Sequence, residues 1–250
     1  TNVLDEKTVI LTPVSYDHMQ YLGYDIKDIA EEKCGIVKQG NLVISENQLP
    51  EVMKVMEARC SKKQAELRLT AEIKVTSKSL GGQSFLYRGK QYKIRSFGVH
   101  QPGNAAAAID CAYHLGLNYE SICEGLMNTL ISARTQYVKG SPDMLIDGAH
   151  NPAAISMLAK TLDTYFKDTR KVLLFACMQD KDYNSMVKIL APHFDYAVVV
   201  SADTKRGADV HELRKLFSKY IKARAELDIQ NGLELAKKIA LKKGSMIVVC

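Results

Sequence analysis

The residues with the clearest chemical potential lie together in the stretch 144–152, which reads Met-Leu-Ile-Asp-Gly-Ala-His-Asn-Pro. Asp147 and His150 can exchange protons or bind a metal, while Asn151 and Pro152 are typical of a helix cap and a first helical turn. A helix that begins here points backbone N–H groups and the positive end of its dipole at the turn. The stretch predicts an anion site, although the same junction also occurs for purely structural reasons.

His18 and Lys33 are the candidate reactive or metal-binding side chains of the first half of the chain. His18 lies in a polar string after an apolar segment and is either structural or a ligand. Lys33 falls on the helical face of Ile26 and Ile29, where an ammonium group is costly. Either its side chain reaches Glu31 or solvent, which the sequence alone favours, or its pKa is lowered so that the neutral amine reacts or captures carbon dioxide as a carbamate.

Asn104 and Arg134 have two interpretations each. Asn104 precedes an alanine-rich segment, so capping is the default, and the alternative is that its amide reads the edge of an adenine base. Arg134 could clamp a phosphate or form a structural ion pair. Polar loops at 180–182 and 205–207 follow two further predicted strands, and we expect them to line one rim with the anion turn.

The elements around these residues change character near residue 134. Before it we expect strands at 8–14 and 42–45, helices at 26–37 and 51–59, antiparallel β structure within 72–94, and helices at 105–115 and 119–130. After it strands are expected near 143–147, 172–177, 196–201 and 246–250, with helices near 152–166, 183–191, 209–222 and 230–242. The second pattern predicts a parallel sheet, and the change of rhythm predicts two domains, 1–134 and 135–250.

Composition excludes several classes of protein. The chain has 250 residues, 46% of them hydrophobic and 25% charged, without an apolar run near the roughly 20 residues of a membrane helix. Its net charge of +6 is spread among acidic residues, so neither nucleic acid nor membrane is an expected partner. The six cysteines form no CxxC pair, which favours a reducing, cytoplasmic setting. The sequence contains no GxxxxGK[ST] phosphate-binding loop.

Several strings occur in a recognisable order. They are TN at 1–2, DHMQYLG at 17–23, IAEEKCGIVK at 29–38, HQPGNAAAA at 100–108, LIDGAHNP at 145–152, DKD at 180–182 and KRGADVHEL at 205–213. Together with Arg134 they resemble the folylpolyglutamate synthase and dihydrofolate synthase family, within the Mur ligase superfamily of ATP-dependent amide ligases. DGAHNP is the most specific string. Peptidoglycan-building Mur ligases usually carry other residues around that histidine, so the folate branch is favoured.

The resemblance implies an α/β fold, with the later part of a P-loop-type central ATPase domain in 1–134 and a Rossmann-like C-terminal domain with a mostly parallel sheet in 135–250. It also implies roles for single residues: His18 as a magnesium ligand, Lys33 as a carbamylated, catalytic lysine and second metal ligand, Asn104 as an adenine contact, Arg134, Asp147 and Asn151 as ATP contacts, and His150 as a catalytic residue where phosphates and the incoming amino acid meet. A carbamate would turn a buried cation into an anionic metal ligand.

The activity implied is ATP-dependent addition of L-glutamate to a folate or dihydropteroate carboxylate through an acyl phosphate, with ATP and Mg²⁺ required and a monomer expected. Which of the two acceptors is used, and how many glutamates are added, stays open. One alternative is a peptidoglycan-type Mur ligase. The other is a non-catalytic nucleotide-binding fragment or paralogue, which the missing phosphate-binding loop motivates.

The sequence departs from the family pattern in two places. Ile131, Ser132 and Ala133 precede Arg134, where the family usually has Trp-Pro-Gly, which leaves the hinge geometry open but not the identity of the arginine. The chain also starts inside the family's DATN string and stops just before an expected Gly-Ser. We therefore expect a longer protein whose P-loop and most of its pterin site lie upstream, where a mitochondrial form would also carry its signal.

Overall fold

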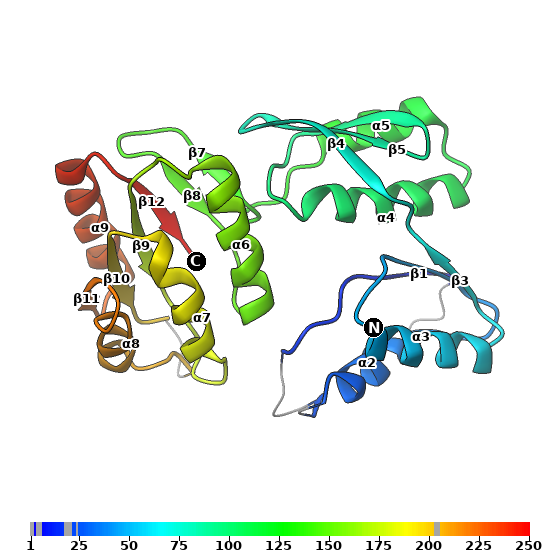
Figure 1. The fold of residues 1–250 in the computed structure, drawn as a ribbon, viewed down its shortest axis with the longest axis horizontal. Helices are drawn as coiled ribbons and strands as arrows, with labels where there is room; N and C mark the ends of the chain where they lie inside the picture. Colours follow the sequence, from blue (N-terminus) through cyan, green and yellow to red (C-terminus); the bar gives the residue numbers. More distant parts are fainter. Residues whose placement is uncertain (1–2, 4–6, 18–21, 24, 203–205) are drawn as a thin grey trace. The chain divides into compact units, whose positions relative to one another are not determined.

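The computed structural model describes residues 3, 7–17, 22–23, 25–202 and 206–250 (Figure 1). The chain divides into two compact units, Thr1–Leu130 and Ile131–Cys250. Each unit has its own hydrophobic core. His18, a candidate metal ligand, lies outside the described residues.

The first unit combines a parallel sheet with an antiparallel sheet. The parallel sheet has the order β1 (Thr8–Leu11), β2 (Leu42–Ser45), β3 (Glu66–Leu69), and the antiparallel sheet the order β4 (Ile73–Ser79), β5 (Gly82–Tyr87), β6 (Lys90–Ile94). The helices of its described part are α2 (Ile26–Cys34), α3 (Pro50–Lys62), α4 (Gln101–His114) and α5 (Tyr119–Asn128).

Strand β2 is covered on both faces, which explains why all its residues are buried. Val43 belongs to the core that β1 forms with α2 and α3, together with Ile29. Leu42 and Ile44 point the other way, because side chains alternate along a strand, and they pack with Ala107 of α4. These contacts hold α4 against the face of the parallel sheet opposite the face that α2 and α3 cover.

Helix α4 is rich in alanine because it lies between the two sheets of this unit. Ala107 faces the parallel sheet, while Ala106 and Ile109 join the core of the antiparallel sheet with Phe85. Small side chains let sheet and helix approach closely, and alanine also has the highest helix propensity.

The second unit contains a six-stranded sheet of order β11-β10-β9-β12-β8-β7, parallel except for the antiparallel pair β7–β8. Its strands are β7 (Gln136–Val138), β8 (Met144–Ile146), β9 (Lys171–Phe175), β10 (Tyr196–Val200), β11 (Lys222–Glu226) and β12 (Met246–Val249). Its helices are α6 (Pro152–Tyr165), α7 (Tyr183–Leu190), the 3-10 turn η1 (Ala191–His193), α8 (Val210–Phe217) and α9 (Ile229–Lys243).

Helices cover both faces of this sheet. Helix α9 packs on one face, and α6, α7 and α8 lie on the other (Figure 1). Phe217 of α8 meets Phe175 of β9 edge to face, with ring centroids 5.3 Å apart. Helix α9 comes so close to β10 that a Cβ at Gly232 would lie 2.1 Å from Cγ1 of Val200. Only glycine fits at that point.

The predicted mostly parallel α/β architecture is confirmed, with one correction at the sheet edge. The helix expected over 209–222 ends at Phe217, and 222–226 form strand β11. Lysine, arginine and alanine carry little strand signal, whereas charged residues are common on edge strands because they discourage pairing with other chains. The short strands β3 and β7 were not predicted either.

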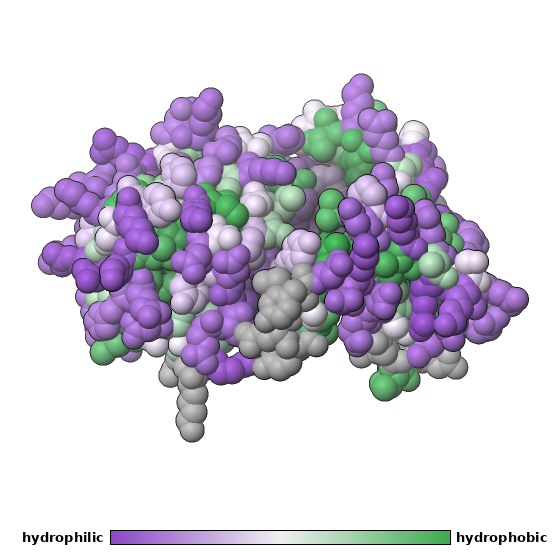
Figure 2. Space-filling model, turned by 60° about the horizontal axis from the view of Figure 1, so that its bottom comes forward, coloured by the Kyte–Doolittle hydropathy of each residue, from purple (hydrophilic) through white to green (hydrophobic). Residues whose placement is uncertain are grey.

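The face of the molecule in Figure 2 is largely polar, with small scattered apolar patches. Within the described ranges, no helix is both long and apolar enough to cross a membrane. All six cysteines are free thiols.

Candidate functional site

The turn after β8 is organised by both oxygens of the Asp147 carboxylate. Oδ1 accepts a hydrogen bond from the backbone N–H of Ala149 at 2.9 Å, and Oδ2 accepts one from Thr135 at 2.7 Å. The Asp147 N–H itself donates to the carbonyl of Val249 at the end of β12. The carboxylate thus joins the turn to the segment that enters β7.

Helix α6 begins as the sequence predicts. Asn151 caps it by accepting a hydrogen bond from the N–H of Ala154 at 2.9 Å, and Pro152 is its first residue. The exposed His150 precedes the cap, and its Nδ1 lies 2.8 Å from the carbonyl oxygen of Gly148. That bond requires a proton on Nδ1, so in the neutral ring Nε2 is the acceptor.

Gly148 of this turn lies close to the side chain of Arg134. A Cβ at 148 would lie 3.2 Å from Nη1 of Arg134 and 3.3 Å from the carbonyl oxygen of Ala133. The Gly148 N–H donates to that same oxygen at 2.7 Å. The structure therefore brings Arg134 and Asp147 together beside the start of α6, as an anion site requires.

The segment before Arg134 keeps a backbone that glycine favours. Ala133 has φ +55° and Thr135 has φ +47°, both in the left-handed region. Gln136 supports the first by accepting the N–H of Ala133 at 3.0 Å, and Asp147 supports the second. Alanine at 133 replaces the usual family glycine, yet the tight turn is present.

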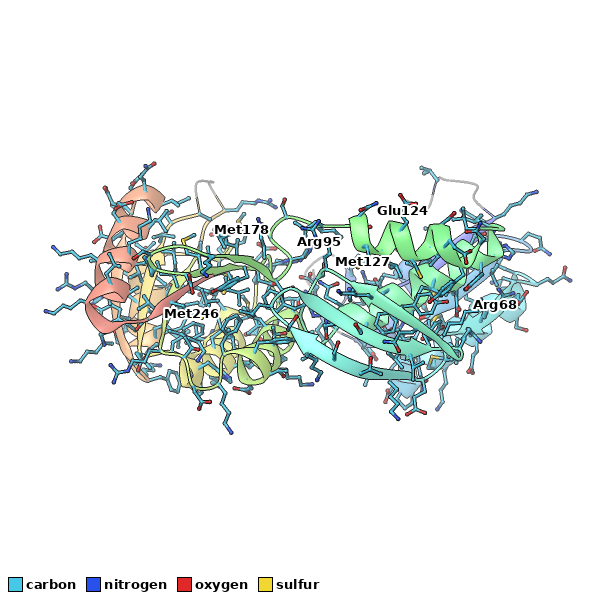
Figure 3. The ribbon with its side chains drawn as sticks, turned by 90° about the horizontal axis from the view of Figure 1, so that it is seen from above. Arg68, Arg95, Glu124, Met127, Met178 and Met246 are labelled. Carbon is cyan, nitrogen blue, oxygen red and sulfur yellow. The ribbon has the colours of Figure 1, made fainter. Side chains whose placement is uncertain are left out.

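The polar loops that follow β9 and β10 lie side by side at the carboxyl ends of these parallel strands, as expected. Gln179 donates its N–H to the carbonyl of Arg206 at 2.8 Å, and Met178 bridges to Gly207. Met178 marks this carboxyl edge in Figure 3, whereas Met246 starts β12 at the opposite edge. Residues 203–205 lie outside the described part of the chain.

Two thiols near this edge are poor nucleophiles. Burial raises the pKa of Cys177 to about 11. Burial also raises the pKa of Cys250, followed by the charge of Asp147. Because the thiolate is the reactive form, neither residue suits covalent catalysis at neutral pH.

Lys33 agrees with the alternative that the sequence alone favours, in which its side chain reaches solvent. Its side chain is exposed, whereas Ile26, Ile29 and Cys34 of the same helix are buried. Helix α2 ends at Cys34, so Lys33 lies in the last turn, where a cation also complements the helix dipole. Burial of the ammonium group therefore gives no reason for a carbamate.

Asn104 is not the cap of α4. The helix begins at Gln101 with His100 in the cap position, and Pro102 lies in its first turn. Asn104 is thus inside the helix, exposed, with Nδ2 3.3 Å from Oε1 of Gln101. Its amide faces solvent, as a ligand contact would need.

The described residues form no group of three or more histidine, cysteine, aspartate or glutamate side chains that could hold a metal ion. Of the two expected magnesium ligands, Lys33 is exposed and His18 cannot be placed. Sequence reasoning overlooked Gly148 and Glu46. No local sequence signal marks Glu46, because it follows the end of β2 at Ser45 and its neighbour Gly103 lies far away in the chain.

Comparisons with known proteins agree with this arrangement. Residues 133–250 match the family model described as "Mur ligase, glutamate ligase domain". The chain is 30% identical over 234 residues to the dihydrofolate synthase/folylpolyglutamate synthase of Mycobacterium tuberculosis, which covers 85% of this chain and 48% of that protein.

Solved structures share the fold across almost the whole chain. The M. tuberculosis folylpolyglutamate synthase complexed with ADP and AMPPCP has a TM-score of 0.90 and 26% identity, over 99% of this chain and 62% of that one. E. coli FolC in complex with DHPP and ADP has a TM-score of 0.84 and 24% identity, over 100% and 59%. The chain therefore belongs to the folylpolyglutamate synthase/dihydrofolate synthase family of the Mur ligase superfamily, and it spans about half the length of the curated relatives it matches.

Proposed function

We propose that the full-length protein is an ATP-dependent ligase, a cytoplasmic monomer that adds L-glutamate to the carboxylate of dihydropteroate or a reduced folate. The observation that carries the proposal is the turn at 147–151, where Asp147 and Arg134 meet the start of α6. The relative of known structure at 26% identity binds ADP and AMPPCP, which supports ATP as the nucleotide. The name of the curated M. tuberculosis relative supports a folate-type acceptor.

The reaction has two steps. An oxygen of the acceptor carboxylate attacks the γ-phosphorus of ATP, the bond to the β-phosphate oxygen breaks, and ADP leaves. The amine of L-glutamate then attacks the carbonyl carbon of the acyl phosphate, and inorganic phosphate leaves with the electron pair. The product is an amide, and the amine loses one proton.

The residues of this chain stabilise charge and accept that proton. Arg134 and the N–H groups at the start of α6 face the phosphates in this proposal, together with Asn151. His150 has Nε2 as its acceptor when neutral, so it is the proposed base for the glutamate amine. Asn104 is the proposed adenine contact, and its exposure leaves the amide accessible.

Magnesium belongs to the proposal as the partner of the triphosphate, where it neutralises charge when bound. His18 and a carbamylated Lys33 are its proposed ligands. Because Lys33 is exposed, carbon dioxide can reach its amine.

The test is glutamate addition by the full-length protein. With ATP, L-glutamate and dihydropteroate or a reduced folate, mass spectrometry should detect an acceptor extended by one glutamyl residue. Asp147→Ala should abolish product, whereas Asp168→Ala, an exposed carboxylate outside the site, should not. Turnover only with a muramyl acceptor would instead indicate a peptidoglycan-type ligase, and nucleotide binding without turnover a non-catalytic paralogue.

A further inference from the structure

The packing of strand β2 against helix α4 places Glu46 beside the first turn of that helix. Leu42 and Ile44 of β2 pack with Ala107, and Glu46 directly follows the end of this strand at Ser45. The helix residue one turn before Ala107 is Gly103. Both carboxylate oxygens of Glu46 would lie 3.0 Å from a Cβ at 103, so the glycine of the string HQPGN leaves room for this carboxylate.

The surroundings of Glu46 make it an unusual carboxylate. Its side chain is half-buried, and burial raises its pKa. No lysine or arginine side chain of the described residues forms an ion pair with it. The first turn of α4 has no acidic residue of its own, and His100 supplies no side-chain cap, so Glu46 is the negative charge at the positive end of this helix.

We propose that Glu46 determines which nucleotide base the protein accepts, by receiving a hydrogen bond from the exocyclic amine of adenine. The inference rests on the proposed function, in which Asn104 contacts adenine. Asn104 directly follows Gly103, and consecutive Cα atoms are only about 3.8 Å apart, so the carboxylate of Glu46 lies beside the same turn of α4 that carries the Asn104 amide.

The chemistry explains why two side chains are needed. The amide of Asn104 has a donor and an acceptor and can turn to suit either adenine or guanine. An ionised carboxylate only accepts, so Glu46 attracts the amine of adenine and repels the carbonyl oxygen that guanine carries at the same position. Glu46 is therefore the member of the pair that selects ATP over GTP.

A purely structural role predicts something different. If Glu46 only stabilises the start of α4, its removal lowers the stability of the helix and reduces the affinity for ATP and for GTP by the same factor. If Glu46 reads the base, Glu46→Gln changes the ratio of the two affinities, because glutamine can also donate to the oxygen of guanine.

The experiment uses the full-length protein and fluorescent N-methylanthraniloyl derivatives of ATP and GTP. In Glu46→Gln the ratio of the two dissociation constants should move toward GTP by about tenfold or more. Gly103→Ala should move it in the same direction, because the added methyl group displaces the carboxylate. In the double variant the two effects should not add. Glu57→Gln, an exposed carboxylate on α3, is the matched control and should change nothing.

An unchanged ratio in Glu46→Gln, with wild-type thermal stability, would overturn the inference. Binding is measured apart from turnover, so the two proposals can fail separately. Wild-type protein that prefers ATP but adds no glutamate would contradict the proposed function, while the variant ratio would still decide on Glu46. Wild-type protein without preference for ATP would contradict the role of Glu46 directly.

Discussion

Replacing Asp147 by asparagine tests how the turn at 147–151 is held. The substitution keeps the shape of the side chain but turns one acceptor oxygen into a donor NH₂ group. One of the two backbone N–H groups, of Thr135 or Ala149, then loses its acceptor and faces a donor. Thr135 is buried, so water replaces that bond poorly.

The magnitude follows from these bonds. A hydrogen bond to a charged group contributes about 1.5–3 kcal/mol, and an unsatisfied buried N–H costs about 1–3 kcal/mol. Thr135 has φ +47°, and its relaxation out of this left-handed conformation offsets about 1–2 kcal/mol of that cost. We expect Asp147→Asn to lower the free energy of opening this segment by about 2–4 kcal/mol.

Hydrogen–deuterium exchange followed by mass spectrometry measures that opening locally, which matters because two units can unfold separately. Peptides that contain the amides of Thr135 and Ala149 should exchange from about 30-fold to several hundred-fold faster in Asp147→Asn. Peptides from α9 should exchange at the wild-type rate. Unchanged exchange at both amides would refute the argument, because it would mean that the carboxylate does not hold the turn.

Three further predictions concern separate elements. Gly232→Ala should lower the melting temperature through about 1–3 kcal/mol of overpacking against Val200, and an unchanged temperature would contradict the close approach of α9. The pKa of Asp209 is lowered, first by the N–H of Glu212, so its contribution to stability is present above pH 3.8 and lost as pH falls below it. The free energy of unfolding, measured with urea, should fall more steeply with decreasing pH for the wild type than for Asp209→Asn. Equal slopes against pH would disprove the linkage. Lys33→Ala should nearly abolish glutamate addition, with partial recovery by short carboxylic acids, and wild-type turnover would reject the carbamate.

Local signals in the sequence predicted the start of α6 correctly. Asn151 followed by Pro152 fixes a helix start through bonds between near neighbours, so no knowledge of the fold is needed. The same proline rule, applied to Pro102, would have placed the start of α4 within one residue of its true start at Gln101 and avoided the assignment of Asn104 as its cap. The prediction was wrong because Asn104 was taken as the signal for the start of α4 in place of Pro102.

Features set by long-range packing could not be predicted in this way. Periodicity gives the face on which Lys33 lies but not where the covering core stops, and α2 ends one residue later. The contact between Glu46 and Gly103 depends on the register of β2 against α4, which joins segments far apart in the chain. The left-handed backbone of Ala133 is likewise stabilised by Gln136 and Gly148, not by its own residue type.

The central claim, an acyl phosphate formed at the turn that Asp147 organises, is tested most directly by isotope transfer. The full-length protein is supplied with ATP, L-glutamate and dihydropteroate labelled with heavy oxygen in its carboxylate. We expect the inorganic phosphate released to carry one labelled oxygen for each amide formed, because the carboxylate oxygen leaves with the phosphate. Unlabelled phosphate alongside amide product would contradict it.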